Sequence, residues 1–149
     1  MATERYYVCR NCPDERPWPT TLLDALRNLA DSKVRPCAQC GTPMSLRIVL
    51  DFGLDAGRCT CDALDAFLPK ERATWSTTDG KQVEYLPFLV ALKKAEGKSE
   101  VSFWLPYWHS VRTDSPEAKE EKKFGQWAPY MDGYLFKSLI DQARMKGYV

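Results

Sequence analysis

The sequence predicts a fold of the α+β class, in which antiparallel strands and helices occupy separate stretches of the chain. Apolar residues recur at helical spacing over 22–30 and again over 135–143. Between these stretches, short runs rich in strand-favouring residues alternate with turn signals, of which Asp79 followed by Gly80 is the strongest. Because a chain of 149 residues can bury a normal hydrophobic core, residues 1–149 are expected to form a single domain.

The first part of the chain is expected to contain two strands separated by a loop and a helix. Residues 6–8 are typical of a short strand, and three prolines predict a loop over 13–19. A helix of about ten residues follows, with Thr20 or Thr21 as its N-cap. Residues 46–52 are rich in strand-favouring apolar side chains and predict the second strand.

Residues 51–110 are predicted to form an antiparallel meander. After a loop rich in glycine and aspartate, the segment 63–68 is ambiguous between strand and helix. The long apolar run over 83–93 is expected to bend at Pro87, and residues 101–105 are expected to form its partner strand.

The last part of the chain combines a polar stretch with a helix. Residues 111–131 are predicted to be a loop with many aromatic and charged side chains. Residues 132–147 predict a C-terminal helix, for which Asp132 is the expected N-cap and Gly147 the residue after the C-cap.

Six cysteines are the unusual feature of the composition, and four of them form two C-x2-C pairs. Each pair lets two thiolates converge on one ion, and two pairs complete the tetrahedral four-sulfur shell that suits Zn2+. The same shell also accepts iron. The ligands expected for this site are Cys9, Cys12, Cys37 and Cys40.

This pattern over residues 5–50 resembles that of zinc ribbons, whose four ligand positions the two pairs match. Twenty-four residues lie between Cys12 and Cys37, which is more than the usual spacer of about 15–20 residues, so the helix is expected to be an insertion between the two metal-binding turns. The resemblance implies a local fold around one structural Zn2+. Zinc ribbons often serve in nucleic-acid or protein binding, so a function follows from it only in these broad terms.

The third pair, Cys59 and Cys61, is open to several interpretations. The two thiols could be structural, could ligate a metal or could be a redox pair, because residues so close in the chain make a strained and reducible disulfide. They could also replace one of the C-x2-C pairs at the metal. Together with His109, the only histidine, they form the candidate second site.

Aromatic side chains are concentrated in residues 103–136, which hold nine of the eighteen in the chain. Most are expected to fill the core, and the alternative is a platform on which single-stranded nucleic acid stacks. The candidates for contact with a partner are Tyr107, Trp108, Phe124, Trp127 and Tyr130.

Charge argues against ranking nucleic acid first among the partners. The formal net charge is +1, and residues 1–50 carry 7 basic and 5 acidic side chains against 14 and 15 in residues 51–149. Nucleic-acid binders usually show a basic excess or stripe, because contacts to phosphates dominate their affinity. The sequence also contains no phosphate-binding glycine loop, dinucleotide fingerprint or zincin motif.

These observations favour a non-enzymatic interaction module that holds one structural zinc ion and binds a protein. The alternatives are nucleic-acid binding through the ribbon and the aromatic loop, and a thiol, redox or metal-dependent enzyme that uses Cys59 and Cys61. The sequence has no apolar stretch long enough to span a bilayer and no secretory signal. The protein is therefore expected to be cytoplasmic and to have no membrane partner. In the cytoplasm, cysteine pairs more often bind metal than form structural disulfides.

Overall fold

The computed structural model of the chain has two compact units, which are described separately. The first comprises Met1–Ala66 and Val90–Phe103, and the second comprises Phe67–Leu89 and Trp104–Val149. The residues that the structure describes are 4–13, 15–17, 21–51, 57–71, 73–96, 100–112, 121–125 and 133–149. Both units combine antiparallel strands with a helix, which confirms the α+β class.

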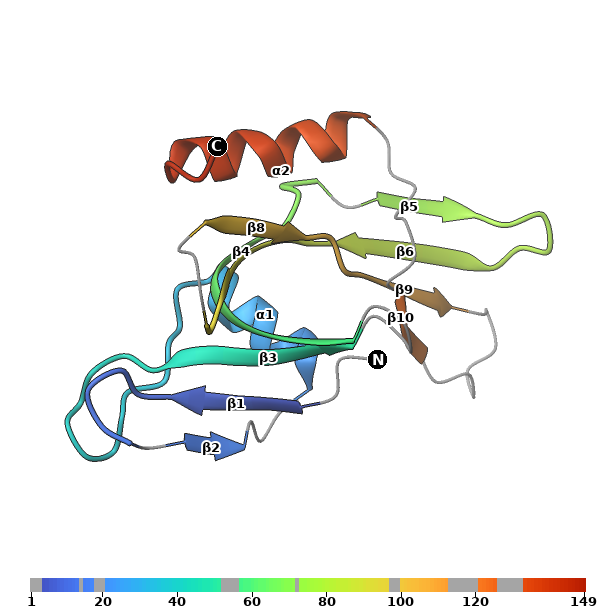
Figure 1. Cartoon of the computed structure of the whole chain (residues 1–149). Helices are drawn as coiled ribbons and strands as arrows, with labels where there is room; N and C mark the ends of the chain where they lie inside the picture. The colour runs from blue at the N-terminus through green and yellow to red at the C-terminus, as the bar shows by residue number, and fades with distance from the viewer. Residues whose placement is uncertain are drawn as a thin grey trace. The chain divides into compact units, whose positions relative to one another are not determined.

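The first unit is built on a six-stranded sheet with the strand order β2-β1-β3-β4-β7-β8 (Figure 1). These strands are β1 (Glu4–Val8), β2 (Glu15–Pro17), β3 (Ser45–Asp51), β4 (Arg58–Phe67), β7 (Leu89–Lys94) and β8 (Val101–Trp104). Strand β2 lies at the edge of the sheet, in the stretch for which three prolines predict a loop. That prediction is wrong for three residues, because an edge position tolerates a proline that cannot donate to the ladder.

Helix α1 (Leu22–Ala30) begins on a cap that its own sequence supplies. The Thr21 hydroxyl oxygen accepts a hydrogen bond from the Asp24 amide at 3.2 Å, and the hydroxyl donates to Asp24 Oδ2 at 2.8 Å. This confirms the predicted helix and its start. After the helix the chain turns through Ser32, whose φ is 56°. The buried face of α1 consists of Leu22, Leu23, Ala25 and Leu26.

Strands β3 and β4 form the middle of the sheet, and their register decides which side chains share a face. Ile48 lies opposite Cys61, and both are buried. On the other face Arg47 donates two hydrogen bonds to the Asp62 carboxylate, at 2.8 and 3.2 Å. Strand β4 therefore contains both the C-x-C pair and most of the segment 63–68 that was ambiguous in the sequence.

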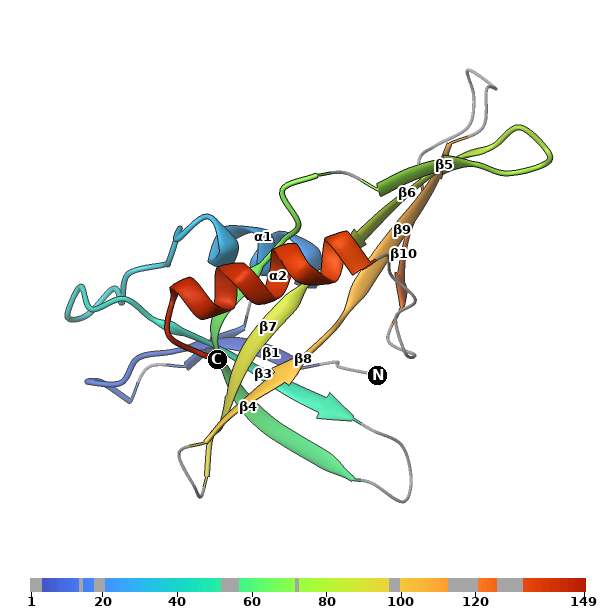
Figure 2. The ribbon, with the colours of Figure 1, turned by 90° about the horizontal axis from the view of Figure 1, so that it is seen from above.

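The second unit contains a four-stranded sheet with the order β10-β9-β6-β5, whose strands lie side by side in Figure 2. The strands are β5 (Ala73–Ser76), β6 (Gln82–Pro87), β9 (Tyr107–Arg112) and β10 (Glu121–Gly125). The predicted hairpin at Asp79 and Gly80 joins β5 to β6, and Gly80 has a φ of 82°. Its loop is closed by the Thr77 amide, which donates to the Lys81 carbonyl at 2.8 Å.

The strand order differs from the predicted meander, because the chain passes repeatedly between the two sheets. Strand β4 pairs with β7 rather than with β5, and β6 pairs with β9 rather than with β7. The predicted bend at Pro87 is one of these crossings, and residues 105–106 are another. At this point the Phe88 amide donates to the Pro106 carbonyl at 2.8 Å, so one backbone hydrogen bond links the two crossings.

Strand β10 corrects the prediction of a continuous loop before the last helix. Its residue Phe124 lies opposite Trp108 of β9, so it belongs to a sheet rather than to a loop. Composition did not reveal this strand, because its one glutamate and two lysines are poor strand formers, which a sheet edge tolerates.

Helix α2 (Gly133–Met145) is the predicted C-terminal helix, and its apolar face is buried within the second unit. Leu139 and Ala143 pack with Phe67 and Leu89 in one core cluster. Gly147 has a φ of 79°, as predicted for the position after the C-cap. The expected N-cap, Asp132, lies outside the described residues. In the part of the chain that the structure describes, no helix is long and apolar enough to cross a membrane.

Candidate metal centre

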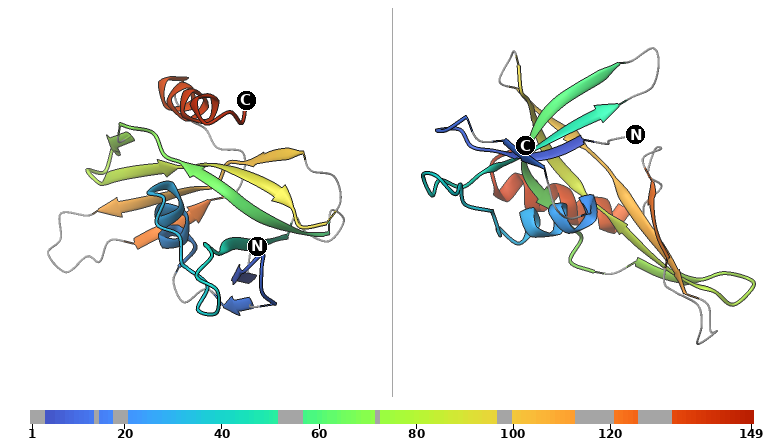
Figure 3. Two further views of the ribbon diagram at one scale, coloured as in Figure 1. Left: turned by 90° about the vertical axis from the view of Figure 1, so that its left-hand side faces the viewer. Right: turned by 90° about the horizontal axis from the view of Figure 1, so that it is seen from below.

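The four cysteines of the two C-x2-C pairs lie together in the first unit. Their sulfur atoms are all within 4.8 Å of one another, and Cys9 Sγ lies 3.5 Å from Cys40 Sγ. The cluster joins two segments that are 31 residues apart in the sequence. The hairpin that carries the second pair follows α1 and leads into β3, along the blue-to-teal part of the chain in Figure 3.

The turn that contains the first C-x2-C pair directly follows β1. The Asn11 amide donates to Cys9 Sγ at 3.4 Å, which orients a backbone dipole toward the sulfur. The Asn11 side chain donates through Nδ2 to Thr42 Oγ1 at 2.9 Å, so it links the two turns to each other. Sequence reasoning did not find Asn11, although its place between the two cysteines of the pair was visible.

The second turn is a tight hairpin held by backbone hydrogen bonds. The Cys37 amide donates to the Thr42 carbonyl at 2.8 Å, and the Gly41 amide donates to the Cys37 carbonyl at 2.9 Å. Gly41 has a φ of 71°, and a Cβ there would meet no atom within 4 Å. The left-handed backbone, rather than a lack of space, therefore favours glycine after the second pair.

The burial of the four cysteines is unequal. Cys9 and Cys37 are 4% and 3% exposed, and they pack with Tyr7 and Met44 in a small apolar cluster. Cys12 is half-buried against this cluster and Cys40 is exposed. The cluster is thus a core of its own beside the sheet, with one edge open to water.

The thiols compete for protons because they are so close. Hydrogen bonding with Thr42, first with its hydroxyl and then with its amide, lowers the pKa of Cys40 to about 6. The hydrogen bond to Cys40, together with burial and the neighbouring Cys9, raises the pKa of Cys12 to about 12. One thiolate is therefore favoured while its neighbour keeps a proton, and only a bound cation would let all four sulfurs carry charge together.

The donor set fits a tetrahedral ion with four sulfur ligands. Four thiolates are the ligands of structural Zn2+ sites and also of mononuclear iron sites. They fill a four-coordinate shell, so no position is left for a substrate or water. Among the described residues, these cysteines are the one group of three or more histidine, cysteine or acidic side chains close enough to share an ion.

The candidate second site is divided between the two units. Cys59 and Cys61 lie next to each other on β4 of the first unit, with their sulfur atoms 3.4 Å apart. His109 lies in β9 of the second unit, where its ring stacks on Tyr107 at a centroid distance of 6.4 Å. A metal-binding role for these three residues stays a prediction.

The aromatic candidates are distributed between the core and the surface. Trp108 is 6% exposed and packs edge-to-face on Phe88 at 5.3 Å, so its ring is part of the core of the second unit. Tyr107 is half-buried beside Tyr85, at 5.4 Å between ring centroids. Trp127 and Tyr130 lie outside the described residues. Four aromatic residues outside this candidate set are exposed: Trp75, Phe103, Tyr134 and Phe136. Phe136 is expected in the core as part of the apolar face of the last helix, and that prediction is wrong because its side chain lies on the exposed side of α2.

No family model, curated protein or solved structure matches this chain. The four-cysteine cluster is the feature of the described residues whose chemistry is most sharply defined, and the function is argued from its geometry.

Proposed function

We propose that this chain is a non-enzymatic interaction module that is stabilised by one structural zinc ion and binds a protein partner. The observation that carries the metal part is the approach of four cysteine sulfurs to within 4.8 Å of one another. Thiolate donors in this number favour Zn2+ in a closed tetrahedral site.

A structural role follows from where the ligands lie. Cys9 directly follows β1 and Cys37 lies in the hairpin that leads into β3, so one ion would cross-link the two segments that flank α1. The small apolar cluster around Tyr7 and Met44 contributes little burial by itself. Structural zinc contributes about 10–16 kcal/mol of apparent binding free energy in finger peptides, which is large beside the stability of a typical domain.

Charge and exposed apolar side chains support a protein partner over nucleic acid. Four thiolates and one Zn2+ lower the formal net charge from +1 to −1, so the chain has no overall attraction for phosphates. Trp75, Tyr134 and Phe136 of the second unit are 48%, 51% and 45% exposed. Exposed large aromatic side chains are enriched where proteins bind one another.

Metal analysis of variants tests the zinc site. The unmodified protein is expected to contain about one zinc ion per chain, which Cys37→Ser removes because it deletes a ligand. Cys59→Ser is the matched control, since it alters a cysteine outside the cluster, and it should keep the zinc. A protein that binds no metal, or one whose zinc is lost with Cys59 and kept without Cys37, would contradict the assignment.

Titration with nucleic acid tests the choice of partner. The zinc-loaded protein should show only weak binding to single-stranded and double-stranded oligonucleotides at physiological salt. Tight binding whose affinity falls steeply with salt concentration would show that the chain neutralises several phosphates. That result would overturn the proposed protein partner while leaving the zinc site intact.

A further inference from the structure

We propose that Cys59 and Cys61 form a reversible dithiol–disulfide pair that exchanges with a low-molecular-weight disulfide. This inference is independent of the proposed function, because it uses none of the four cysteines of the metal cluster. It assigns a covalent modification site to the middle of the first unit.

The geometry of β4 places the two thiols together. Residues two apart on a strand point to the same face, and the Cys59 and Cys61 sulfurs lie 3.4 Å apart. The register with β3 sets them opposite Leu50 and Ile48, and on the other side the Ala95 amide donates to the Thr60 carbonyl at 2.9 Å. The backbone between the two cysteines is therefore held from both sides, so their approach does not depend on a mobile loop.

The two thiols differ in their access to solvent. Cys61 is 5% exposed, whereas Cys59 is half-buried and lines a pocket of about 500 Å³. Burial, and then the hydrogen bond with Cys59, raises the pKa of Cys61 to about 12, so Cys61 keeps its proton. Cys59 is consequently the thiol that meets a small molecule first, and Cys61 is placed to resolve the product.

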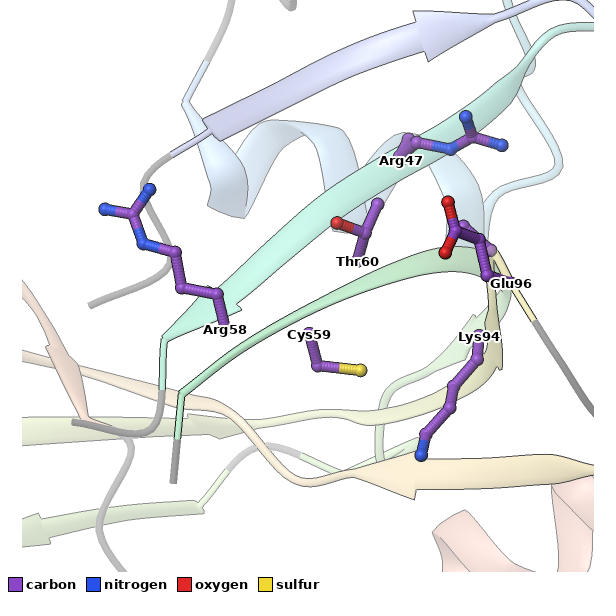
Figure 4. A pocket seen from close by; sticks show the side chains of 7 residues that line it. Arg47, Arg58, Cys59, Thr60, Lys94 and Glu96 are labelled. Atoms are coloured by element: carbon purple, nitrogen blue, oxygen red, sulfur yellow. The ribbon is translucent and has the colours of Figure 1, made fainter. Parts of the chain in front are cut away.

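The pocket has charged side chains on both faces of the sheet, and Lys94 is the basic one that extends on the side of the Cys59 thiol. Arg47 and Arg58 also line it, but they alternate with Cys59 in the β3–β4 register and therefore lie on the opposite face of the sheet. In Figure 4 the side chains of Cys59 and Lys94 extend on the same side of their strands. The positive charge of Lys94 also acts on the Cys61 thiol, where it favours the thiolate.

The exchange proceeds in two balanced steps. The Cys59 thiolate attacks one sulfur of the disulfide, the sulfur–sulfur bond breaks, and the leaving thiolate takes up a proton, so that a mixed disulfide remains on Cys59. Cys61 then loses its proton and attacks the Cys59 sulfur, which expels the second thiol. The protein has lost two hydrogens to form the Cys59–Cys61 disulfide, and the small disulfide has been reduced to two thiols.

Strand geometry explains why such a bond would be reversible. The Cα atoms of alternate residues on a strand are about 6.6–6.8 Å apart, which is at the far end of the range of about 4.4–6.8 Å that disulfides span. The bond is therefore strained and readily reduced, as suits a switch rather than a structural cross-link. Zinc is the less suitable occupant, because the described residues bring no third ligand to this pair.

The test uses the zinc-loaded full chain and oxidised glutathione, which is a low-molecular-weight disulfide. Peptide mapping by mass spectrometry should find a disulfide between Cys59 and Cys61, with the zinc retained. Cys61→Ser should instead hold one glutathionyl group on Cys59, which a reducing agent removes. Cys59→Ser should react with oxidised glutathione at least about tenfold more slowly than Cys61→Ser, because the remaining thiol of Cys59→Ser is buried and protonated and is therefore a poor nucleophile.

Three outcomes would overturn the proposal. In the first, the Cys59–Cys61 disulfide does not form while the chain stays reduced there. In the second, oxidation instead releases zinc and couples cysteines of the metal cluster. In the third, Cys59→Ser reacts as fast as Cys61→Ser. If either variant fails to fold, peptide mapping of the unmodified chain decides between the first two outcomes and the proposed disulfide.

Discussion

Ser32 is the one residue other than glycine that has a positive φ among those the structure describes. It follows α1, where its amide donates to the Leu29 carbonyl at 3.1 Å and the Lys33 amide donates to the Asn28 carbonyl at 2.8 Å. These two hydrogen bonds form the turn that often ends a helix, and glycine is the usual residue at its left-handed position because a Cβ is strained there. Serine at this position therefore makes the turn less stable than glycine would.

Replacing Ser32 with glycine is expected to raise the free energy of unfolding by about 0.5–1 kcal/mol, since the left-handed strain disappears. Denaturant titration of the zinc-loaded protein measures the change. The control is Ser32→Ala, which keeps the Cβ and should bring no gain. Equal stability of the glycine variant and the unmodified protein would show that the turn is not strained.

Individual residues of the metal cluster could be predicted because ligand chemistry depends on residue type and spacing. The two C-x2-C pairs indicated which four sulfurs would meet, with Cys59 and Cys61 as the alternative to one pair, and the structure brings the four sulfurs of the C-x2-C pairs together. The hydrogen-bond partners Asn11 and Thr42 could not be predicted, because their roles depend on how the two turns face each other across 31 residues. Spacing within one turn says nothing about that orientation.

At the scale of elements, the end of α2 depends on one glycine. Gly147 has a φ of 79°, and the Tyr148 amide beyond it donates to the Ala143 carbonyl at 3.0 Å. Tyr148 then packs edge-to-face on Phe67, at 6.0 Å between ring centroids. The turn thus brings an aromatic ring back onto the core of the second unit.

Gly147→Ala is expected to lower the free energy of unfolding by about 1 kcal/mol, because it places a Cβ in the left-handed region. Gly133→Ala at the first residue of the same helix is the matched control. A Cβ there is equally unobstructed, but φ is not positive, so alanine should stabilise the helix by up to about 1 kcal/mol. Thermal unfolding of both variants measures the difference, and a shift of the same sign in both would contradict this explanation.

Elements with local signals were predictable, and elements that depend on distant partners were not. The cap at Thr21 and the glycine at 147 lie within a few residues of the helices they delimit, so the sequence reveals them. Strand β10 has poor strand propensity and exists because β9 pairs with it. The C-x-C pair likewise lies inside a ten-residue strand, although the sequence before it predicts a loop.

At the scale of the whole molecule, all four cysteines of the proposed metal site lie in the first unit. Removal of zinc by a chelator is expected to accelerate amide hydrogen exchange in α1, β1 and β3, which lie near the ligands in the chain. The core cluster around Leu139 and Ala143 contains no ligand, so α2 should be affected much less. Hydrogen exchange followed by mass spectrometry resolves these segments.

Re-addition of zinc provides the control, since it should restore protection in the first unit. Equal acceleration in α2 and in β1 would show that the two units lose structure together. The prediction that zinc stabilises only the first unit would then be wrong.

The division of strands between two sheets could not be predicted from the sequence. Each strand from β4 to β9 has an unremarkable local pattern, and adjacent strands in a chain usually pair. Here Pro87 removes a donor at the end of β6, and the chain leaves the sheet at that residue. The sequence shows that a strand ends at Pro87, but it does not show with which distant strand the following segment pairs.

The hydrogen bond between the Phe88 amide and the Pro106 carbonyl has a kinetic consequence. Pro87 lies opposite Tyr107, so β6 and β9 are the two arms of a hairpin whose long connection is the pair β7 and β8. Closing a long connection costs chain entropy, and that cost is smaller when the connection is already folded back on itself. Pairing of β7 with β8 therefore shortens the effective loop of the β6–β9 hairpin. We expect the β7–β8 pair to form before β6 pairs with β9.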